Sequence, residues 1–364
     1  MRGILCAAVM LWASASQAAT VGWTVVSDIE IIPAGNAASG IESVAFDSQG
    51  NIWGATGNLY QLDPLGNVTF HNYPGTGAIN VVRVNSSDLV FTGSRYSGGP
   101  LTTPAEVWTF DGAFSLFGTT SLAGGSIYGM SVSPTNGDVL VTLVNGDEVG
   151  LAKFNSSGVQ QWYVQNQPQS HGYGRVAYNT SGEGFFVDGK GVIYSVDETN
   201  GDLSELQNTF YDYVTDNNGF IQGFAISDAG TFFASATLTD IETPEGPVNQ
   251  GRIFRLNPST GETELMAIGN GVTASDIQII EDSIYASRFL IAQNDVSGNL
   301  MFASLVGDTP LDQFTGPLDS QWVGFLSNQL VPEPSTGWLL VLGLFAVRKR
   351  NGKRLRNRTV DLQR

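Results

Sequence analysis

Short runs of alternating hydrophobic and polar residues fill the chain, and one kind of run returns six times. In each run the apolar residues stand two apart, which is the spacing of a strand with one buried face. Matched apolar positions in successive runs lie 38, 48, 46, 48 and 53 residues apart. Periods of about 40–50 residues with several strands each are typical of propeller blades. The six runs are Ser43–Asp47, Val81–Asn85, Gly129–Ser133, Arg175–Asn179, Gly223–Ser227 and Asp276–Ile280.

The segments between these runs contain further apolar strands and tight polar turns that begin with Asp or Asn and contain Gly. We therefore predict an all-β fold, a β-propeller of six blades, over residues 20–306. Residues 307–331 are interpreted as a spacer, with a seventh blade left open if 313–327 adds strands. The strand Trp23–Ile32 is expected to pair beside Met301–Val306 and to close the ring, which would remove an open sheet edge.

Charge narrows the choice of partners. Residues 20–331 carry 8 Lys and Arg against 32 Asp and Glu, a net charge of −24. Such a body repels phosphate backbones, so we expect no nucleic-acid partner. Solubility, cations or cationic partners fit the acidity. The one cysteine, Cys6, lies near the N-terminus, so the body has neither a disulfide nor a thiolate metal site.

The N-terminal residues 1–19 have the pattern of a signal peptide. Arg2 supplies the positive charge, an apolar stretch follows, and small residues end at Ala18 and Ala19. This pattern predicts export through the Sec machinery and cleavage by signal peptidase.

The C-terminal segment combines three features. Pro332-Glu333-Pro334 keeps the chain extended, residues 337–347 are apolar, and Arg348-Lys349-Arg350 adds a basic stop. An apolar helix of 11 residues spans only about 17 Å, so we expect a short transmembrane helix that relies on snorkelling cations and local thinning of the bilayer. The charge order places the body outside the inner membrane.

This segment, residues 332–350, resembles the PEP-CTERM sorting signal. The resemblance implies recognition by an exosortase, processing during export, and a cell-surface or extracellular-matrix location in a bacterium that makes exopolysaccharide. Members of that family usually end soon after the basic cluster, whereas here a basic tail, residues 351–364, follows.

In a propeller the first strand of each blade begins at one mouth of the axial channel. The residues two before the matched apolar positions are expected to surround that mouth. They are Glu42, Asn80, Tyr128, Gly174, Gln222 and Ser275. Long loops at Ser94–Pro104, Leu238–Gln250 and Phe289–Gly298 should reach the same face, where binding sites often form, and Tyr173 is a nearby aromatic residue able to stack on a sugar ring.

Two functional hypotheses follow. A non-catalytic binding or matrix protein would use Glu42, Asn80, Tyr128, Tyr173 and Gln222 as ligand-binding residues, with exopolysaccharide as a partner and no cofactor. The alternative is a metal-dependent hydrolase or lactonase around Glu42, because Ile41–Asp47 resembles the first blade of gluconolactonase and senescence-marker propellers, in which a mouth Glu helps to hold a divalent metal.

Asp276 is one residue out of phase and is expected to point into the blade stack. The turn Asp197–Asp202 could be interpreted as a calcium loop, although a hairpin turn explains its residues. No sequence motif of catalysis is found, so enzymatic activity is left undecided, with the non-catalytic hypothesis favoured.

Overall fold

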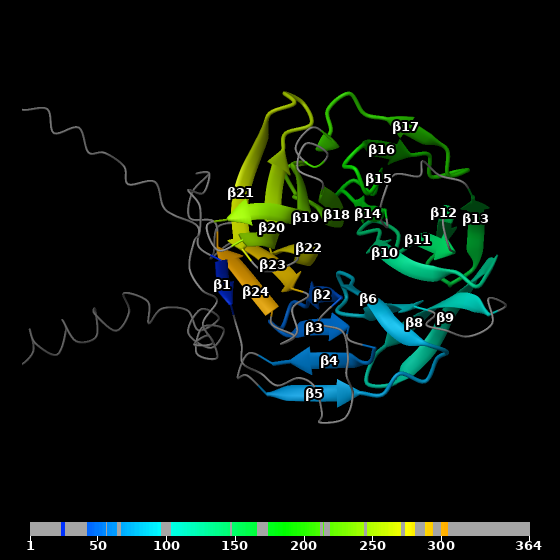
Figure 1. Cartoon of the computed structure of the whole chain (residues 1–364). Coiled ribbons are helices and arrows are strands. Elements are labelled where there is room, and N and C mark those ends of the chain that lie inside the picture. The colour runs from blue at the N-terminus through cyan, green and yellow to red at the C-terminus, as the bar shows by residue number, and fades with distance from the viewer. Residues whose placement is uncertain are drawn as a thin grey trace, which may run out of the picture.

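The computed structural model describes residues 23–25, 42–55, 57–63, 67–95, 103–145, 148–165, 174–211, 214, 219–243, 246–270, 274–280, 288–293 and 300–304. These ranges contain 24 strands in six four-stranded antiparallel sheets, arranged around a central axis (Figure 1). The β-propeller fold predicted from the sequence is therefore confirmed. The predicted leader, spacer, membrane helix and basic tail lie outside the described residues.

Five of the sheets are each made of four consecutive strands. The first contains β2 (Ser43–Phe46), β3 (Ile52–Ala55), β4 (Leu59–Leu62) and β5 (Val68–His71). The second contains β6 (Ala78–Val84), β7 (Val90–Arg95), β8 (Pro104–Phe110) and β9 (Phe114–Ala123). The third contains β10 (Ser126–Val132), β11 (Val139–Asn145), β12 (Glu148–Phe154) and β13 (Gln160–Val164). The fourth contains β14 (Arg175–Tyr178), β15 (Gly184–Val187), β16 (Ile193–Val196) and β17 (Leu203–Glu205). The fifth contains β18 (Gly219–Ile226), β19 (Phe232–Thr243), β20 (Gly246–Leu256) and β21 (Thr263–Asn270).

The sixth sheet joins the two ends of the body. Its strand order is β1-β24-β23-β22, with β1 (Trp23–Val25), β22 (Ala274–Ile280), β23 (Arg288–Gln293) and β24 (Leu300–Ser304). The register pairs Trp23 with Ala303 and Val25 with Met301. The predicted closing strand is thus observed beside the predicted partner, and three of its residues are described.

The six alternating runs found in the sequence form the innermost strands β2, β6, β10, β14, β18 and β22, which surround the axis (Figure 1). Their apolar residues are buried between neighbouring sheets rather than inside one of them. One such cluster combines Val81, Phe91 and Val107 of the second blade with Met130 and Phe154 of the third. The hydrophobic core is therefore a ring of joints, each shared by two blades.

Polar turns connect the strands as the sequence predicts. At the first hairpin the Asp47 carboxylate accepts hydrogen bonds from the Asn51 backbone N–H at 2.8 Å and from Trp53 Nε1 at 2.8 Å, while Gly50 takes a φ of 85°. Only glycine adopts such a φ without steric cost. Gly54 serves packing instead, because a Cβ atom there would lie 1.8 Å from the ring of Tyr60 on the adjacent strand.

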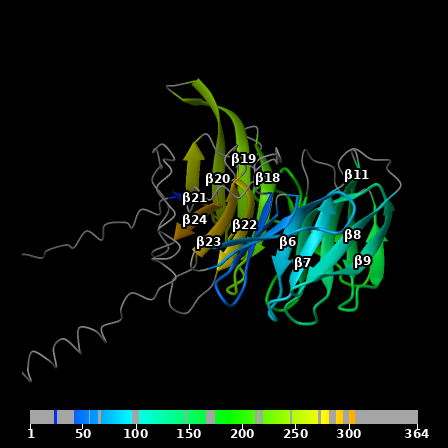
Figure 2. The ribbon, with the colours of Figure 1, turned by 90° about the horizontal axis from the view of Figure 1, so that it is seen from below.

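Two predicted loops contain strand residues. In the segment Phe289–Gly298, strand β23 continues to Gln293. The segment Leu238–Gln250 was expected to be a loop, but β19 and β20 continue through it, with Ile241 paired to Val248 and Thr243 paired to Gly246. The loop prediction is therefore wrong for most of this segment: cross-strand backbone hydrogen bonds extend the hairpin, and a shift in register between Leu238 and Ile241 accommodates it. Figure 2 shows this hairpin reaching farther along the axis direction than the other blades.

Candidate binding site at the channel mouth

All six predicted mouth positions lie outside the regular backbone pairing of the innermost strand of their blade. In four inner strands the pairing skips one residue, and the skipped residues are Asn80, Tyr128, Gln222 and Ser275. In the other two blades Glu42 and Gly174 directly precede the strand. A β-bulge bends its strand and redirects the extra side chain. The recurring bulge explains why these positions differ from the rest of the strand.

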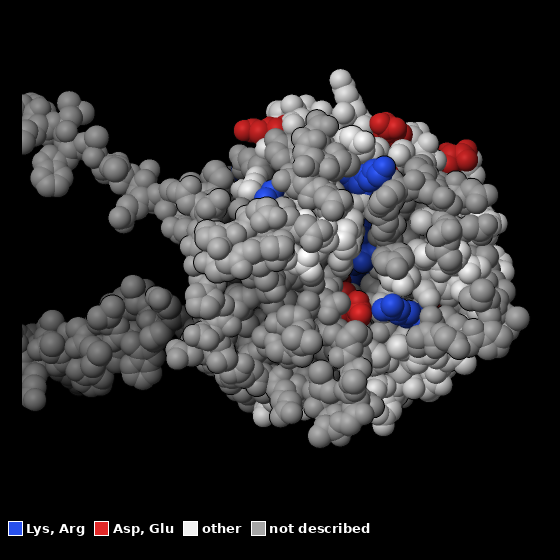
Figure 3. Space-filling model, viewed as in Figure 1, with Lys and Arg blue, Asp and Glu red and all other residues white. Residues whose placement is uncertain are grey.

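A partly exposed group of side chains lies near two of the predicted mouth positions. The Arg95 guanidinium lies 5.7 Å from the centre of the Tyr128 ring and 3.5 Å from the Glu42 carboxylate. The Arg95 and Glu42 side chains are 39% and 21% exposed, so solvent and ligands reach them. Figure 3 shows the mouth face, on which basic and acidic side chains gather near the middle of the ring.

Two other mouth residues are buried. Asn80 donates from Nδ2 to the Ile127 carbonyl of the next blade at 2.8 Å, while its Oδ1 has no hydrogen-bond partner among the described residues. Ser275 is 2% exposed and its Oγ also lacks a partner there. Asn80 therefore holds two blades together, and its Oδ1 is enclosed within the protein. Gln222 is half-buried and accepts a hydrogen bond through its backbone carbonyl from Arg175 Nε. Tyr173 lies outside the described residues.

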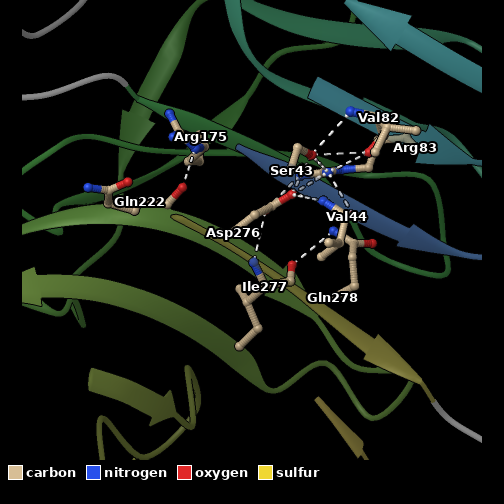
Figure 4. A network of polar contacts seen from close by, with 9 residues as sticks. All are labelled: Ser43, Val44, Val82, Arg83, Arg175, Gln222, Asp276, Ile277 and Gln278. Carbon is tan, nitrogen blue, oxygen red and sulfur yellow. Dashed lines mark hydrogen bonds and ion pairs between the residues drawn. The ribbon is translucent and has the colours of Figure 1, made fainter. Parts of the chain in front are cut away.

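A buried network lies beneath the mouth (Figure 4). Asp276 accepts two hydrogen bonds from Arg83, from Nη1 at 2.7 Å and from Nη2 at 3.1 Å. The same carboxylate accepts from Ser43 Oγ at 2.6 Å. The prediction that Asp276 points into the blade stack is confirmed, because its partners belong to the two following blades. This bidentate pair is satisfied internally, which assigns it to structure rather than to ligand binding.

Arg175 stands near this network on the inner strand of the fourth blade (Figure 4). It is 8% exposed. Burial lowers the pKa of its guanidinium to about 10; the carboxylates of Asp276 and Glu42 oppose that shift, and the Arg83 cation adds to it. The side chain is therefore still a cation at neutral pH.

The described residues offer little to a metal ion. No group of three or more His, Cys, Asp or Glu in the described ranges is arranged to hold one. Glu42, the residue proposed for the lactonase alternative, faces a guanidinium that competes with any divalent cation. In the turn considered for calcium, the Asp197 carboxylate accepts from the Thr199 N–H at 2.8 Å and its hydroxyl at 2.6 Å, and Asp202 accepts from Asn200. These bonds are those of a hairpin turn.

The three arginines near the axis were not identified from the sequence as site residues. The signal was present: only eight basic residues occur between positions 20 and 331, and Arg83 and Arg175 fall inside the repeated inner-strand runs. Their partners lie in other blades, so local patterns could not assign them.

Comparisons with known proteins agree with this architecture. Residues 330–352 match the PEP-CTERM protein-sorting motif. No curated protein shows significant sequence similarity to the chain. Among solved structures, the chain resembles a gluconolactonase from Xanthomonas campestris with 14% identity, a TM-score of 0.53, and coverage of 80% of this chain and 92% of that one. The extracellular domain of a hybrid two-component system from B. thetaiotaomicron has 12% identity and a TM-score of 0.49, with 81% of this chain and 35% of that chain covered.

The likeness to the gluconolactonase agrees with the propeller fold, and the family match identifies the sorting motif. The motif confirms the resemblance seen in the sequence and implies export and membrane anchoring through the C-terminal segment. In the described part of the chain no helix is long and apolar enough to cross a bilayer. The segment 337–347 lies beyond that part.

Proposed function

We propose that this protein is an exported, surface-sorted binding protein whose propeller mouth holds a polysaccharide without catalysing a reaction on it. The sorting motif supports delivery to the outside of the cell by an exosortase. The observation that carries the binding function is the partly exposed group formed by Arg95, Tyr128 and Glu42. An aromatic ring flanked by a few charged groups on a rigid scaffold is a common form of ligand site.

The mouth geometry favours binding over hydrolysis. Asn80, which would complete a metal site with Glu42, is 4% exposed, and its side chain connects two blades by donating to the Ile127 carbonyl. Glu42 itself is paired with Arg95. A hydrolase needs a metal or an activated nucleophile at such a site, whereas a binding protein needs only a stable, complementary surface.

The test compares full-chain variants purified in detergent against a panel of immobilised polysaccharides. We expect Tyr128→Ala to weaken binding about tenfold, or ~1.4 kcal/mol. The control is Phe70→Ala, which removes an aromatic residue that is 41% exposed on outer strand β5, and it should leave binding unchanged. Equal melting temperatures of the variants would exclude a folding defect.

A second measurement addresses the lactonase alternative. The chain is incubated with divalent metals and sugar lactones, and metal binding is followed by calorimetry. Metal-dependent lactone hydrolysis that disappears in Glu42→Ala would overturn the non-catalytic proposal.

A further inference from the structure

Four large hydrophobic side chains are strongly exposed in the described part of the chain: Phe70, Leu116, Val159 and Tyr211. Phe70 lies on the outer strand β5 and Leu116 near the start of the outer strand β9. Val159 ends the turn between β12 and β13, at the end of the third blade opposite the mouth. Single exposed apolar residues are common on protein surfaces and need no explanation. Tyr211 differs from these three because of where it lies.

Tyr211 belongs to the mouth end of the fourth blade. The inner strand β14 begins at the mouth, and the four strands of the blade alternate in direction. The turn between β15 and β16 and the segment after β17 therefore both return to the mouth end. A hydrogen bond of 2.8 Å from the Phe210 N–H to the Gly191 carbonyl fixes the segment on that turn. The Gly189 carbonyl accepts a second bond, also 2.8 Å, from the backbone of β18 one residue before the mouth position of the fifth blade.

The backbone that carries Tyr211 is firmly held. Phe210 and Val214 are both 0% exposed, and the Val214 N–H donates to the Phe210 carbonyl at 3.2 Å. In the turn below, the Asp188 carboxylate accepts two backbone N–H groups of its own turn at 2.9 Å. Gly191 has a φ of 92°, and a Cβ atom there would lie 2.9 Å from that of Phe210. Tyr211 is 41% exposed on this base, so little ordering would accompany the binding of a ligand.

A second tyrosine of the same face is Tyr128, in the mouth group. Contacts between described residues connect the two positions. The charge of Arg175 interacts with Tyr128, and Arg175 Nε donates to the Gln222 carbonyl. The residue before Gln222 is the one that donates to the turn below Tyr211. The two tyrosines therefore belong to one continuous part of the mouth face, and they come from different blades.

We propose that Tyr211 is a second sugar-stacking position, and that the ligand is an extended linear polysaccharide that lies across the mouth face from Tyr128 to Tyr211. This inference rests on the proposed function and specifies its ligand as a chain rather than a single sugar. A tyrosine has an apolar ring and a polar tip, which match the C–H face and the hydroxyl rim of a sugar ring. A ribbon-like β-1,4-linked chain presents such faces along its length.

Two stacking positions for one ligand make its affinity depend on chain length. A disaccharide stacked on Tyr128 ends before Tyr211, whereas a longer chain contacts both rings. The second contact is then intramolecular and adds to the affinity without a new association step. A hexasaccharide should therefore bind at least about tenfold more tightly than the disaccharide of the same polymer, and Tyr211 should account for most of the difference.

The experiment uses the full chain in detergent and follows binding by calorimetry. The probes are the disaccharides and hexasaccharides of cellulose, β-1,4-mannan and chitin. We expect Tyr211→Ala to weaken hexasaccharide binding about tenfold and to leave disaccharide binding unchanged. Tyr211→Phe, which keeps the ring, should bind like the parent. The matched control is Phe70→Ala, because Phe70 is also 41% exposed but lies on an outer strand, and it should bind both probes like the parent.

The outcomes separate this inference from the proposed function. Equal affinities of disaccharide and hexasaccharide in the parent, or hexasaccharide binding in Tyr211→Ala as tight as in Phe70→Ala, would overturn the second stacking position. An equal loss in Tyr211→Phe and Tyr211→Ala would overturn stacking by the ring. Binding of panel polysaccharides without binding of any hexasaccharide would overturn the extended-chain ligand. In all these cases polysaccharide binding that depends on Tyr128 would stand. Binding to none of the probes and to no member of the wider polysaccharide panel would overturn both proposals.

Discussion

The sixth sheet is joined to the first and second blades by a buried carboxylate, whereas the fourth and fifth blades meet through apolar groups. At the first of these joints Asp276 of β22 binds Ser43 of the first blade and Arg83 of the second, across 233 and 193 residues of sequence. At the second, Phe210, Phe232 and Phe254 pack with aliphatic residues of both blades. Both joints are buried, so the difference lies in chemistry rather than in exposure.

The position of each joint along the chain suggests a reason. The fourth and fifth blades are consecutive, so the chain itself brings them together and non-directional packing is sufficient. The sixth sheet and the first blade contain opposite ends of the body. The β1–β24 pairing in the sheet and the Asp276 network beside the axis are among the contacts that hold these ends together. A bidentate ion pair accepts one geometry only, and we interpret it as the element that fixes how the ring closes.

The largest effect is expected from Asp276→Asn, which hardly changes the volume but removes the charge. Arg83 would remain buried without its partner, so the free energy of unfolding should fall by about 3–5 kcal/mol. Urea denaturation measures it. The control is Arg95→Gln, which breaks the exposed pair with Glu42 and should cost at most about 1 kcal/mol.

A double variant tests whether charge is required at this joint. Replacing both partners, Asp276→Leu with Arg83→Met, should restore much of the stability lost in Asp276→Asn, because no buried charge is left unpaired. If Asp276→Asn costs less than the exposed-pair control, the ion pair is not what holds the ring closed.

The apolar joint should tolerate a larger change in shape. Phe254 is 1% exposed, yet Phe254→Leu keeps the site hydrophobic, and we expect a loss of about 1–1.5 kcal/mol in the same denaturation assay. Phe254→Ala serves as the reference for a cavity, at about 3–5 kcal/mol. A Phe254→Leu variant as unstable as Asp276→Asn would remove the contrast between the two joints.

The same contrast separates the features that the sequence could predict from those that it could not. Runs such as Gly129–Ser133 repeat with a local period, so the inner strands, the turns and the six mouth positions followed from spacing alone. The ion pair of Arg83 with Asp276 did not, because no local pattern links residues 193 positions apart. The bulges at Asn80 and Tyr128 were missed as well, since a residue skipped in the ladder looks in the sequence like any other strand residue.

Removing a buried polar atom that has no partner should raise the stability of the protein, whereas removing the charge of Asp276 should lower it. Tyr60 is fully buried opposite Gly54, its hydroxyl has no hydrogen-bond partner among the described residues, and burial raises its pKa. Tyr60→Phe removes that hydroxyl, so we expect a gain of about 1 kcal/mol in unfolding free energy. The matched control is Tyr178→Phe, whose hydroxyl donates to Glu198 at 3.2 Å and should lose stability. Destabilisation by Tyr60→Phe would show that its hydroxyl is satisfied.

The smallest effect concerns pH at the joint between the first and second blades. The His71 ring lies 4.3 Å from that of Phe110 and 5.9 Å from that of Trp53, and its Nε2 has no partner in the described part of the chain. Desolvation lowers the His71 pKa from its ordinary value of 6.5. The folded state therefore binds the proton less readily than the unfolded chain does, and protonation favours unfolding. Stability should be constant above about pH 6.5 and should decline as pH falls below it.

Thermal melts between pH 5.5 and 7.5 would show this decline in the parent and a flatter profile in His71→Phe, which keeps the aromatic packing without the titrating group. Identical slopes in the two proteins would assign the pH dependence to other groups.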